Sequence, residues 1–327
     1  MKKGKLSENI LKRSILKQIK RRRSEVRLGA AVGEDCAVLS LAADEMVVLS
    51  TDPVTLCSKN IGSLSVNTAL NDIASSGAEP IGVLLSCMLP PEIEESEIRE
   101  MMRSVEEACE KLGVEALGGH TEITDAVNKP ILTVTGVGKV KETDMVRSGA
   151  VESGDDIIVT KWVGLEGTSI IAKEREKELL ERFAPDFVAC AQELDRYISV
   201  IPEARVAMQS GVHAMHDVTE GGIFGALWEI AEASRVGLEI DLKAIPIRQE
   251  TVEICNHYDI NPYTLISGGS MLIAAADGFT LVRELKRCGI DAAVVGKATD
   301  GNDRVVENNG ERRFLTPPET DELYKLL

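Results

Sequence analysis

The sequence lacks a long apolar run. No stretch approaches the roughly twenty consecutive apolar residues that a membrane-spanning helix needs, and the lysine-rich start is not followed by the apolar core of a signal peptide. We therefore expect a cytoplasmic protein with no membrane association.

Paired cysteines are also absent. The seven cysteines are scattered, odd in number and never spaced as CxxC, which argues against a disulfide framework and against a zinc site. The formal net charge of -16 would repel nucleic-acid phosphates over most of the surface, so nucleic-acid binding is not expected. The motifs GxxxxGK[ST], GxGxxG, GxSxG and HExxH are missing too, which leaves Walker-type, Rossmann, serine hydrolase and zincin sites unsupported.

What the chain does contain predicts two domains of mixed α and β structure. Its 327 residues exceed the size at which a single core usually stops growing. Short apolar runs alternate with amphipathic segments from residue 36 onward, and the small, polar segment 148–156 is turn-prone. We therefore predict domains at 1–150 and 151–327.

Apolar periodicity and turn residues predict the individual elements. Strands at 36–39 and 46–50 are expected to be joined by a turn that contains Asp44. Helices are expected near 62–77 and from the Pro90-Pro91 pair to Gly113. Further strands are predicted at 81–88, 114–117, 131–138 and 157–160.

Four polar clusters in the first half follow the ends of apolar runs: 33–38 (GEDCAV), 50–53 (STDP), 67–77 (NTALNDIASSG) and 118–124 (GGHTEIT). They contain Asp35, Asp52 and Asp72. Gathered carboxylates repel one another unless a cation joins them, and Mg²⁺ prefers hard oxygen ligands and substrate phosphates. The alternative for each aspartate alone is that it caps a turn or helix.

The second half has one comparable cluster, HDVTEGG at 216–222, at the start of an amphipathic helix. Amides at such a helix start can bind an anion, with Asp217, Thr219 and Glu220 as side-chain partners. The alternative is a turn that Gly221 and Gly222 permit, followed by an ordinary cap.

The first 27 residues are strongly basic, with Arg21, Arg22 and Arg23 in a row. One interpretation is a solvated amphipathic helix, with Leu6 and other apolar residues on one face. The other is that some of these cations reach the phosphates of a ligand.

In order and spacing, these clusters resemble the aminoimidazole ribonucleotide (AIR) synthetase-like, or PurM-like, superfamily. GEDCAV is similar to its GDDAAV loop, STDP to its TD motif and NDIASSG to its NDIAxxG helix. GGHTE is similar to its GGDT or GGET turn, HDVTEGG to its second-domain glycine motif and SGGSMLI to its SSG turn. The likeness spans nearly the whole chain and is greatest for the HypE-like hydrogenase maturation branch.

The resemblance implies a two-domain α+β fold with an N-terminal mixed sheet that forms a dimer interface and a C-terminal α/β domain. It also implies a homodimer that binds ATP and Mg²⁺ along that interface. Carried over by position, the resemblance implies that Mg²⁺ and the triphosphate are held by Asp35, Asp52 and Asp72. The residues expected to line the nucleotide are Asn67, Gly118, Gly119, His120, Thr121 and Glu122. Those expected to face the phosphate end or a second substrate are Asp217, Thr219, Gly221 and Gly222. Asp52, Asp72 and His120 are the candidate catalytic residues.

Two features depart from the family pattern. His120 stands where many members have an acidic residue, which could shift metal ligation to Glu122. The chain ends DELYKLL rather than in the cysteine-bearing tail of HypE enzymes, and the last cysteine, Cys288, falls inside a predicted helix. Dehydration of a carbamoyl group on its own tail is therefore not expected.

The predicted function is that of a Mg²⁺-dependent, ATP-binding enzyme that phosphorylates or activates an oxygen of a small molecule or carbonyl group. Its expected partner is a small-molecule substrate or a maturation protein. Two alternatives are an ATP-binding maturation or scaffold dimer without catalysis and a small-molecule kinase similar to thiamine-monophosphate kinase.

Overall fold

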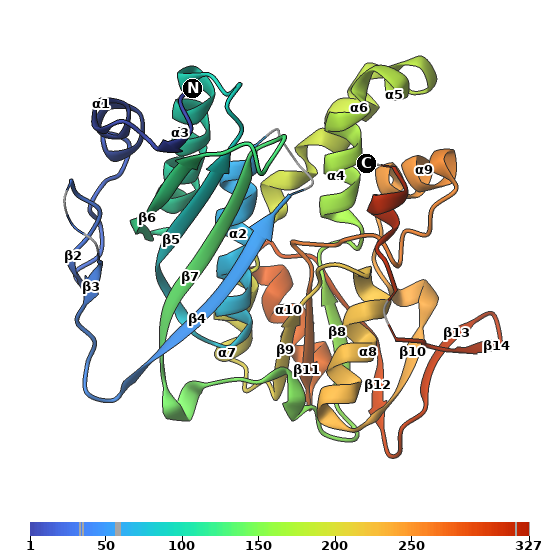
Figure 1. The fold of residues 1–327 in the computed structure, drawn as a ribbon. Helices are drawn as coiled ribbons and strands as arrows, with labels where there is room; N and C mark the ends of the chain where they lie inside the picture. Colours follow the sequence, from blue (N-terminus) through green and yellow to red (C-terminus); the bar gives the residue numbers. More distant parts are fainter. Residues whose placement is uncertain (33, 35, 56–59, 318, 327) are drawn as a thin grey trace. The chain divides into compact units, whose positions relative to one another are not determined.

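The computed structural model describes residues 1–32, 34, 36–55, 60–317 and 319–326. By its contacts the chain divides into two compact units, residues 1–73 with 78–144 and residues 74–77 with 145–327. Each unit is built around its own sheet (Figure 1). None of the helices in the described part of the chain has the length and apolar character that crossing a membrane requires.

The first unit contains the predicted mixed sheet, which has five strands. The strands lie in the order β1-β6-β5-β7-β4, and only β5 and β6 run parallel to each other. Their bounds are β1 (Gly4–Lys5), β4 (Glu45–Val54), β5 (Glu79–Leu89), β6 (Glu115–Ile123) and β7 (Ile131–Lys141).

Helices α2 (Ile61–Ser75) and α3 (Glu95–Leu112) cover one face of this sheet (Figure 1). α2 packs closely on β7, where a Cβ on Gly136 would lie 2.7 Å from the Ala69 carbonyl oxygen. α3 begins four residues later than predicted, because Glu94 and Glu97 form a capping box that fixes its first turn. The methionines of its apolar stripe are buried in the core.

Among the described residues of the first unit, no helix covers the opposite face of the sheet along β4 (Figure 1). Along β4, Val47 and Leu49 are 53% and 63% exposed, and Leu84 on β5 is 37% exposed. Thr51 and Thr135 continue this surface as a cross-strand pair, joined by a 2.9 Å hydrogen bond between their hydroxyl groups. We call these five residues the open face.

Two predictions for the first unit differ from the structure. The strand predicted at 36–39 is only the short β3 (Val38–Leu39), which pairs with β2 (Val26–Leu28) in a separate two-stranded sheet, whereas the strand predicted at 46–50 lies within β4. β4 instead pairs with β7 over ten residues, which satisfies far more backbone groups than the short β3 could. The segment 118–124 is not a turn either, since β6 continues through both glycines to Ile123.

The basic N-terminal segment is held by carboxylates of its own unit. It forms α1 (Glu8–Ile10) and a π-helical continuation (Leu11–Leu16). Beyond this helix Arg22 pairs with Glu106 on α3, and Arg21 lies 3.6 Å from Glu115, a β6 side chain that is 1% exposed. These contacts give Arg21 and Arg22 a structural role, and the alternative, that some of the basic residues reach the phosphates of a ligand, stays a prediction.

The second unit contains a seven-stranded sheet in the order β14-β13-β10-β12-β8-β11-β9, in which only β10 and β13 are parallel neighbours. Its strands are β8 (Asp156–Thr160), β9 (Ala214–Asp217), β10 (Gly237–Asp241), β11 (Met271–Ala275), β12 (Ala292–Thr299), β13 (Arg304–Asn308) and β14 (Glu311–Phe314). Its helices are α4 (Leu165–Glu174), α5 (Glu176–Arg182), α6 (Pro185–Gln192), α7 (Ile201–Met208), α8 (Gly222–Ser234), α9 (Gln249–Tyr258) and α10 (Gly278–Arg287).

Helices α8 and α10 pack on opposite faces of this sheet. Ile157 and Val159 of β8 join the apolar core that α8 covers. Alternate residues point to the other face, where a Cβ on Gly278 of α10 would lie 3.0 Å from a carbon of Ile158. Cys288, predicted inside a helix, is instead the exposed residue that ends α10, because the chain turns at Gly289 with a φ of +78°.

Candidate functional site

The first unit brings two of the predicted aspartates together. Ser50 and Asp52 on β4 alternate with exposed residues and point toward α2, which carries Asp72. The Ser50 hydroxyl donates a hydrogen bond to Asp72 Oδ2 and lies 3.5 Å from Asp52 Oδ2. We call Asp52 and Asp72 the carboxylate pair.

The carboxylate pair is electrostatically unbalanced. Burial, and after it the neighbouring carboxylate of Asp72, together raise the pKa of Asp52 to about 6. Among the described residues, no lysine or arginine forms an ion pair with either carboxylate. Two adjacent carboxylates without a cation have the chemistry that a divalent ion with oxygen ligands requires.

The third predicted metal ligand, Asp35, lies outside the described residues. In the part of the chain that the structure describes, no group of three or more metal-ligating side chains is found. Asn67 of α2 serves the helix itself, since its side-chain amide donates to the Ser63 carbonyl oxygen at 2.8 Å.

The other predicted nucleotide residues of the first unit lie on β6. Gly118, Gly119, His120 and Thr121 line a pocket of about 750 Å³. The remaining walls combine apolar N-terminal side chains with hydroxyl groups from neighbouring strands, and they include Leu6, Leu11, Ile15, Ser86, Thr133 and Thr135. A cavity of this size and mixed lining is typical of small-molecule sites.

The carboxylate pair is not among the described residues that line this pocket. β4 and β6 are separated by β7 and β5, so Asp52 and His120 lie about three strand spacings, roughly 14 Å, apart. His120 lies 3.8 Å from Glu122 on the same strand. Within one subunit, Glu122 therefore does not join the carboxylate pair around a single ion.

In the second unit the glycine motif forms the predicted helix start. Gly221 and Gly222 have φ values of +81° and +59°, and α8 begins at Gly222. A Cβ on Gly222 would lie 2.6 Å from the Tyr263 carbonyl oxygen, so this position requires glycine. The Thr219 carbonyl oxygen accepts from the Gly222 amide at 3.1 Å, and Asp217 at the end of β9 is buried.

An acidic side chain of the same unit already contacts this helix start. The Gly221 amide donates to Asp321 Oδ2 at 2.8 Å, and Asp321 is 2% exposed. Nearby, the Tyr324 hydroxyl donates to Glu220 at 2.9 Å. Asp321 can be predicted from sequence as the cap of the last helical turn (Glu322–Lys325), but its contact with a glycine 100 positions away leaves no local signal.

Glu166 is a second acidic residue that sequence reasoning missed. It lies in the first turn of α4, is 6% exposed, and accepts a hydrogen bond from the Gly268 amide at 3.0 Å. Burial raises the pKa of Glu166 to about 7, with smaller contributions from Asp321 and Glu220. The glycine turns of the second unit thus surround a carboxyl group that is readily protonated near neutral pH.

Replacing Glu166 by glutamine should stabilise the protein at alkaline pH. Because the pKa of Glu166 rises from 4.5 to about 7 on folding, its contribution to stability is complete below pH 4.5 and is lost as the pH rises through 7. Glutamine keeps the acceptor for Gly268 and does not ionise. Thermal unfolding should show Glu166→Gln gaining on the order of 2 kcal/mol over wild type at pH 8 and almost nothing at pH 5. An equal change at both pH values would contradict the assignment.

Comparison with known proteins identifies the family. The model of the AIR synthase related protein N-terminal domain matches residues 33–140, and the C-terminal domain model matches residues 152–308. The chain belongs to the AIR synthase-related protein family. The two-domain α+β fold predicted from the resemblance is confirmed.

Members of the family with known names include enzymes. A carbamoyl dehydratase HypE of Rhodobacter capsulatus is 28% identical over 293 residues, 88% of this chain and 81% of that protein. A thiamine-monophosphate kinase of Methanospirillum hungatei is 31% identical over 225 residues, 66% of this chain and 71% of that protein. A crystal structure of hydrogenase maturation protein HypE in complex with ATP has a TM-score of 0.80 at 20% identity, covering 96% of this chain and 95% of that one. The HypE-like assignment and the prediction of an enzyme are confirmed at the level of the family.

Proposed function

We propose that this protein uses Mg²⁺ and ATP to phosphorylate an oxygen of a small molecule or carbonyl group. The carboxylate pair is the observation that carries the proposal. Phosphoryl transfer asks the protein mainly to position its substrates and to neutralise charge, and bound Mg²⁺ would supply that neutralisation at the phosphate oxygens. Asp52 and Asp72 would hold the ion, and the Ser50 hydroxyl would keep Asp72 in place.

The pocket on β6 is the proposed site for the base and sugar of the nucleotide. Its apolar wall of Leu6, Leu11 and Ile15 suits a planar base, whereas Ser86 and Thr133 offer hydroxyl groups to a sugar. His120 would act from the edge of this pocket as a polar contact, since its ring is 55% exposed and only loosely paired with Glu122. Family relatives that bind ATP or transfer phosphate support this reading.

We further propose a homodimer that forms through the open face. Val47, Leu49 and Leu84 expose apolar side chains on one surface of a regular sheet, and exposed apolar patches on soluble proteins commonly mark contacts with partners. A second copy would remove these side chains from water. It would also bring another sheet against β7, which lines the pocket through Thr133 and Thr135, and against β4, which carries Asp52.

Leu49→Glu should convert the dimer to a monomer. A charge at the centre of the open face would be buried without a partner in the dimer, which costs several kcal/mol. Light scattering coupled to gel filtration should show half the mass of the wild type. Phe279→Glu is the matched control, because Phe279 is 65% exposed on the second unit and should leave the mass unchanged. A dimeric Leu49→Glu variant would show that the open face is not the interface.

Two measurements separate an enzyme from a scaffold that binds ATP without using it. Differential scanning fluorimetry with MgATP should raise the melting temperature in both cases, because a ligand that binds only the folded state stabilises it. Phosphate release with candidate acceptors should occur only for the enzyme. Binding without release under any acceptor would favour the scaffold, and no thermal shift at all would contradict nucleotide binding.

A further inference from the structure

A short hairpin forms one wall of the proposed nucleotide pocket. It consists of β2, β3 and the described residues between them, and we call it the β2–β3 hairpin. The residues that it contributes to the described lining of the pocket are Ala30, Ala31, Glu34, Cys36 and Ala37. A two-stranded sheet is only marginally stable on its own in water, and these strands have three and two residues. The position of this wall therefore depends on contacts with the rest of the first unit.

The first of these contacts is apolar. Val26 of β2 is 7% exposed and packs against three buried side chains of the five-stranded sheet, which are Ile81, Leu117 and Val137. Burial of apolar surface stabilises an arrangement without prescribing a direction. This cluster therefore places the β2–β3 hairpin on the sheet but does not fix its orientation.

The second contact is ionic and directional. Glu25 extends the β2–β3 hairpin, since its carbonyl oxygen accepts from the Ser40 amide at 2.9 Å. Lys139 of β7 lies 3.0 Å from a carboxylate oxygen of Glu25 and 3.0 Å from one of Glu45 on β4. Arg23 adds a second link, because it lies 2.7 Å from Glu25 and 2.7 Å from Glu79 of β5. Both cations thus join the hairpin to carboxylates of the sheet.

The centre of this network is shielded from water. The side chains of Lys139 and Glu25 are 17% and 11% exposed. Burial alone would raise the pKa of Glu25, yet the hydrogen bonds that it accepts from Arg23 and Lys139 lower this pKa to about 2. Glu25 is therefore ionised near neutral pH. Shielded ion pairs are screened by salt less than surface pairs are, and removing one partner leaves the other charge uncompensated.

Removing Lys139 would leave three carboxylates around the guanidinium of Arg23. Glu45 and Glu79 belong to the sheet, whereas Glu25 belongs to the β2–β3 hairpin, so their repulsion would act directly between hairpin and sheet. Lys139 itself is not among the described residues that line the pocket. Its influence on a bound nucleotide would therefore pass through the pocket wall.

We propose that Lys139 is a positioning residue for nucleotide binding, which fixes the β2–β3 hairpin on the sheet and so holds Ala30, Ala31 and Ala37 in place as a pocket wall. A wall that must first be ordered by the ligand costs affinity, whereas one that is already fixed does not. The inference rests on the proposed nucleotide site of the first unit. It adds a residue that lies outside both the pocket and the carboxylate pair.

Isothermal titration calorimetry with Mg²⁺ and a nonhydrolysable ATP analogue measures the effect. Lys139→Met should bind at least about tenfold more weakly than wild type, a loss of about 1.4 kcal/mol. Lys139→Arg keeps the charge and should recover most of this loss. Lys141→Met is the matched control, because Lys141 also lies on β7 but pairs only with the exposed Asp44 at 2.9 Å among the described residues. Equal weakening by both methionine variants, or none by Lys139→Met, would overturn the proposal.

A second variant and hydrogen exchange distinguish positioning from a general loss of stability. Glu25→Gln removes the other partner of the same ion pair and should also weaken binding about tenfold, so the test does not depend on how well Lys139→Met folds. The double variant should bind about as weakly as the weaker single variant, because both changes break one link. Amides of β2 and β3 should exchange at least about tenfold faster in Lys139→Met, and those of α2 should not. Additive losses, or faster exchange throughout the first unit, would contradict a positioning role.

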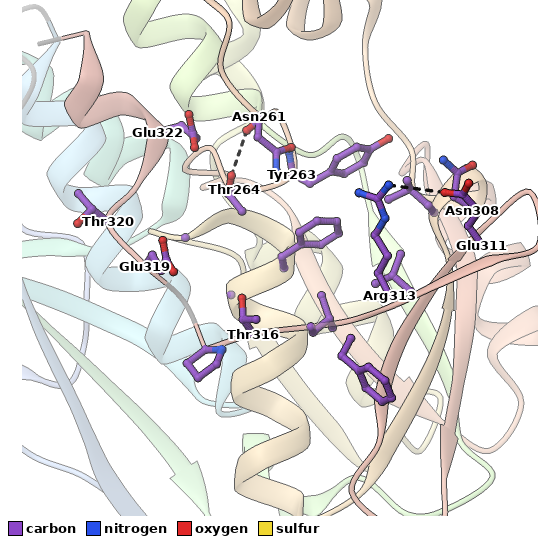
Figure 2. A pocket seen from close by; sticks show the side chains of 18 residues that line it. Asn261, Tyr263, Thr264, Asn308, Glu311, Arg313, Thr316, Glu319, Thr320 and Glu322 are labelled. Carbon is purple, nitrogen blue, oxygen red and sulfur yellow. Dashed lines mark hydrogen bonds and ion pairs between the residues drawn. The ribbon is translucent and has the colours of Figure 1, made fainter.

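A pocket of the second unit separates failure of this inference from failure of the proposed function. Figure 2 shows this pocket of about 570 Å³, with Arg313 of β14 on its wall. Arg313→Met removes a positive charge there and should leave affinity for the nucleotide unchanged. Weaker binding by Arg313→Met but not by Lys139→Met would place the nucleotide in the second unit and overturn the proposed site. Wild-type affinity in both variants would contradict the role of Lys139 alone, and a wild type that binds no nucleotide would overturn both proposals.

Discussion

Asp52→Asn is expected to reduce MgATP turnover at least about a hundredfold while the protein stays folded. A hundredfold loss corresponds to about 2.7 kcal/mol of transition-state stabilisation, well within what a catalytic metal ion supplies. Asparagine has nearly the same shape and removes the repulsion with Asp72, so the fold should be no less stable than wild type. Phosphate release and thermal unfolding, measured on the same preparation, give both results.

Asp125→Asn provides the control for this substitution. Asp125 also belongs to the first unit, but its side chain is 68% exposed and pairs with Lys3 at the surface. Its replacement removes the same charge and should leave turnover unchanged. Equal losses in both variants would mean that net charge, and not the carboxylate pair, determines activity.

The pH dependence of Mg²⁺ binding tests the same site without relying on turnover. Because the pKa of Asp52 is raised from 3.8 to about 6, the stability that this group contributes without metal is complete below pH 3.8 and is lost as the pH rises through 6. Mg²⁺ should therefore raise the melting temperature clearly at pH 7.5 and very little at pH 5, where it must displace a proton. Asp52→Asn should abolish the effect. A shift that is the same at both pH values would rule out the carboxylate pair as the metal site.

Local signals in the sequence were sufficient for the elements that carry the carboxylate pair. The apolar spacing around Ala69 and Ile73 and the stop at Gly77 predict α2, and α2 ends within two residues of the expected position. The cluster at 50–53 was expected to follow its strand, whereas β4 continues to Val54 and carries Asp52 within it. Periodicity therefore predicted the helix that carries Asp72, but it showed neither that β4 would extend past Asp52 nor that Ser50 would connect the two carboxylates.

Contacts between distant segments could not be predicted in this way. The partner of β4 is chosen by the length of β7, and the Gly221 amide is satisfied by Asp321 from the far end of the unit. Glu166 gave no signal because its position in the first turn of α4 is ordinary for an acidic residue. Its raised pKa arises from burial that only the assembled core creates.

The two adjacent glycines of β6 illustrate how one motif can combine two physical roles. Sequence reasoning assigns both Gly118 and Gly119 to a turn that lines the nucleotide. In the structure both lie within a strand, where the register of β5 against β6 shifts between Val83 and Leu84. Gly119 has a φ of +144°, outside the usual range of L residues, whereas Gly118 has an ordinary backbone conformation.

Gly119→Ala should accordingly destabilise the first unit by roughly 3 kcal/mol or more, the combined cost of overpacking and backbone strain. An added Cβ would lie 1.9 Å from the Leu85 carbonyl oxygen, so the two parallel strands would have to separate. Gly118→Ala is the matched control, since its nearest neighbour would be a carbon of Leu84 at an ordinary 3.6 Å. Denaturant unfolding should show a large loss for the first variant and almost none for the second. If a stable Gly118→Ala variant binds MgATP more weakly, then Gly119 is required for the strand and Gly118 for the ligand. Comparable losses of unfolding free energy in both variants would instead show that both glycines are required for the fold.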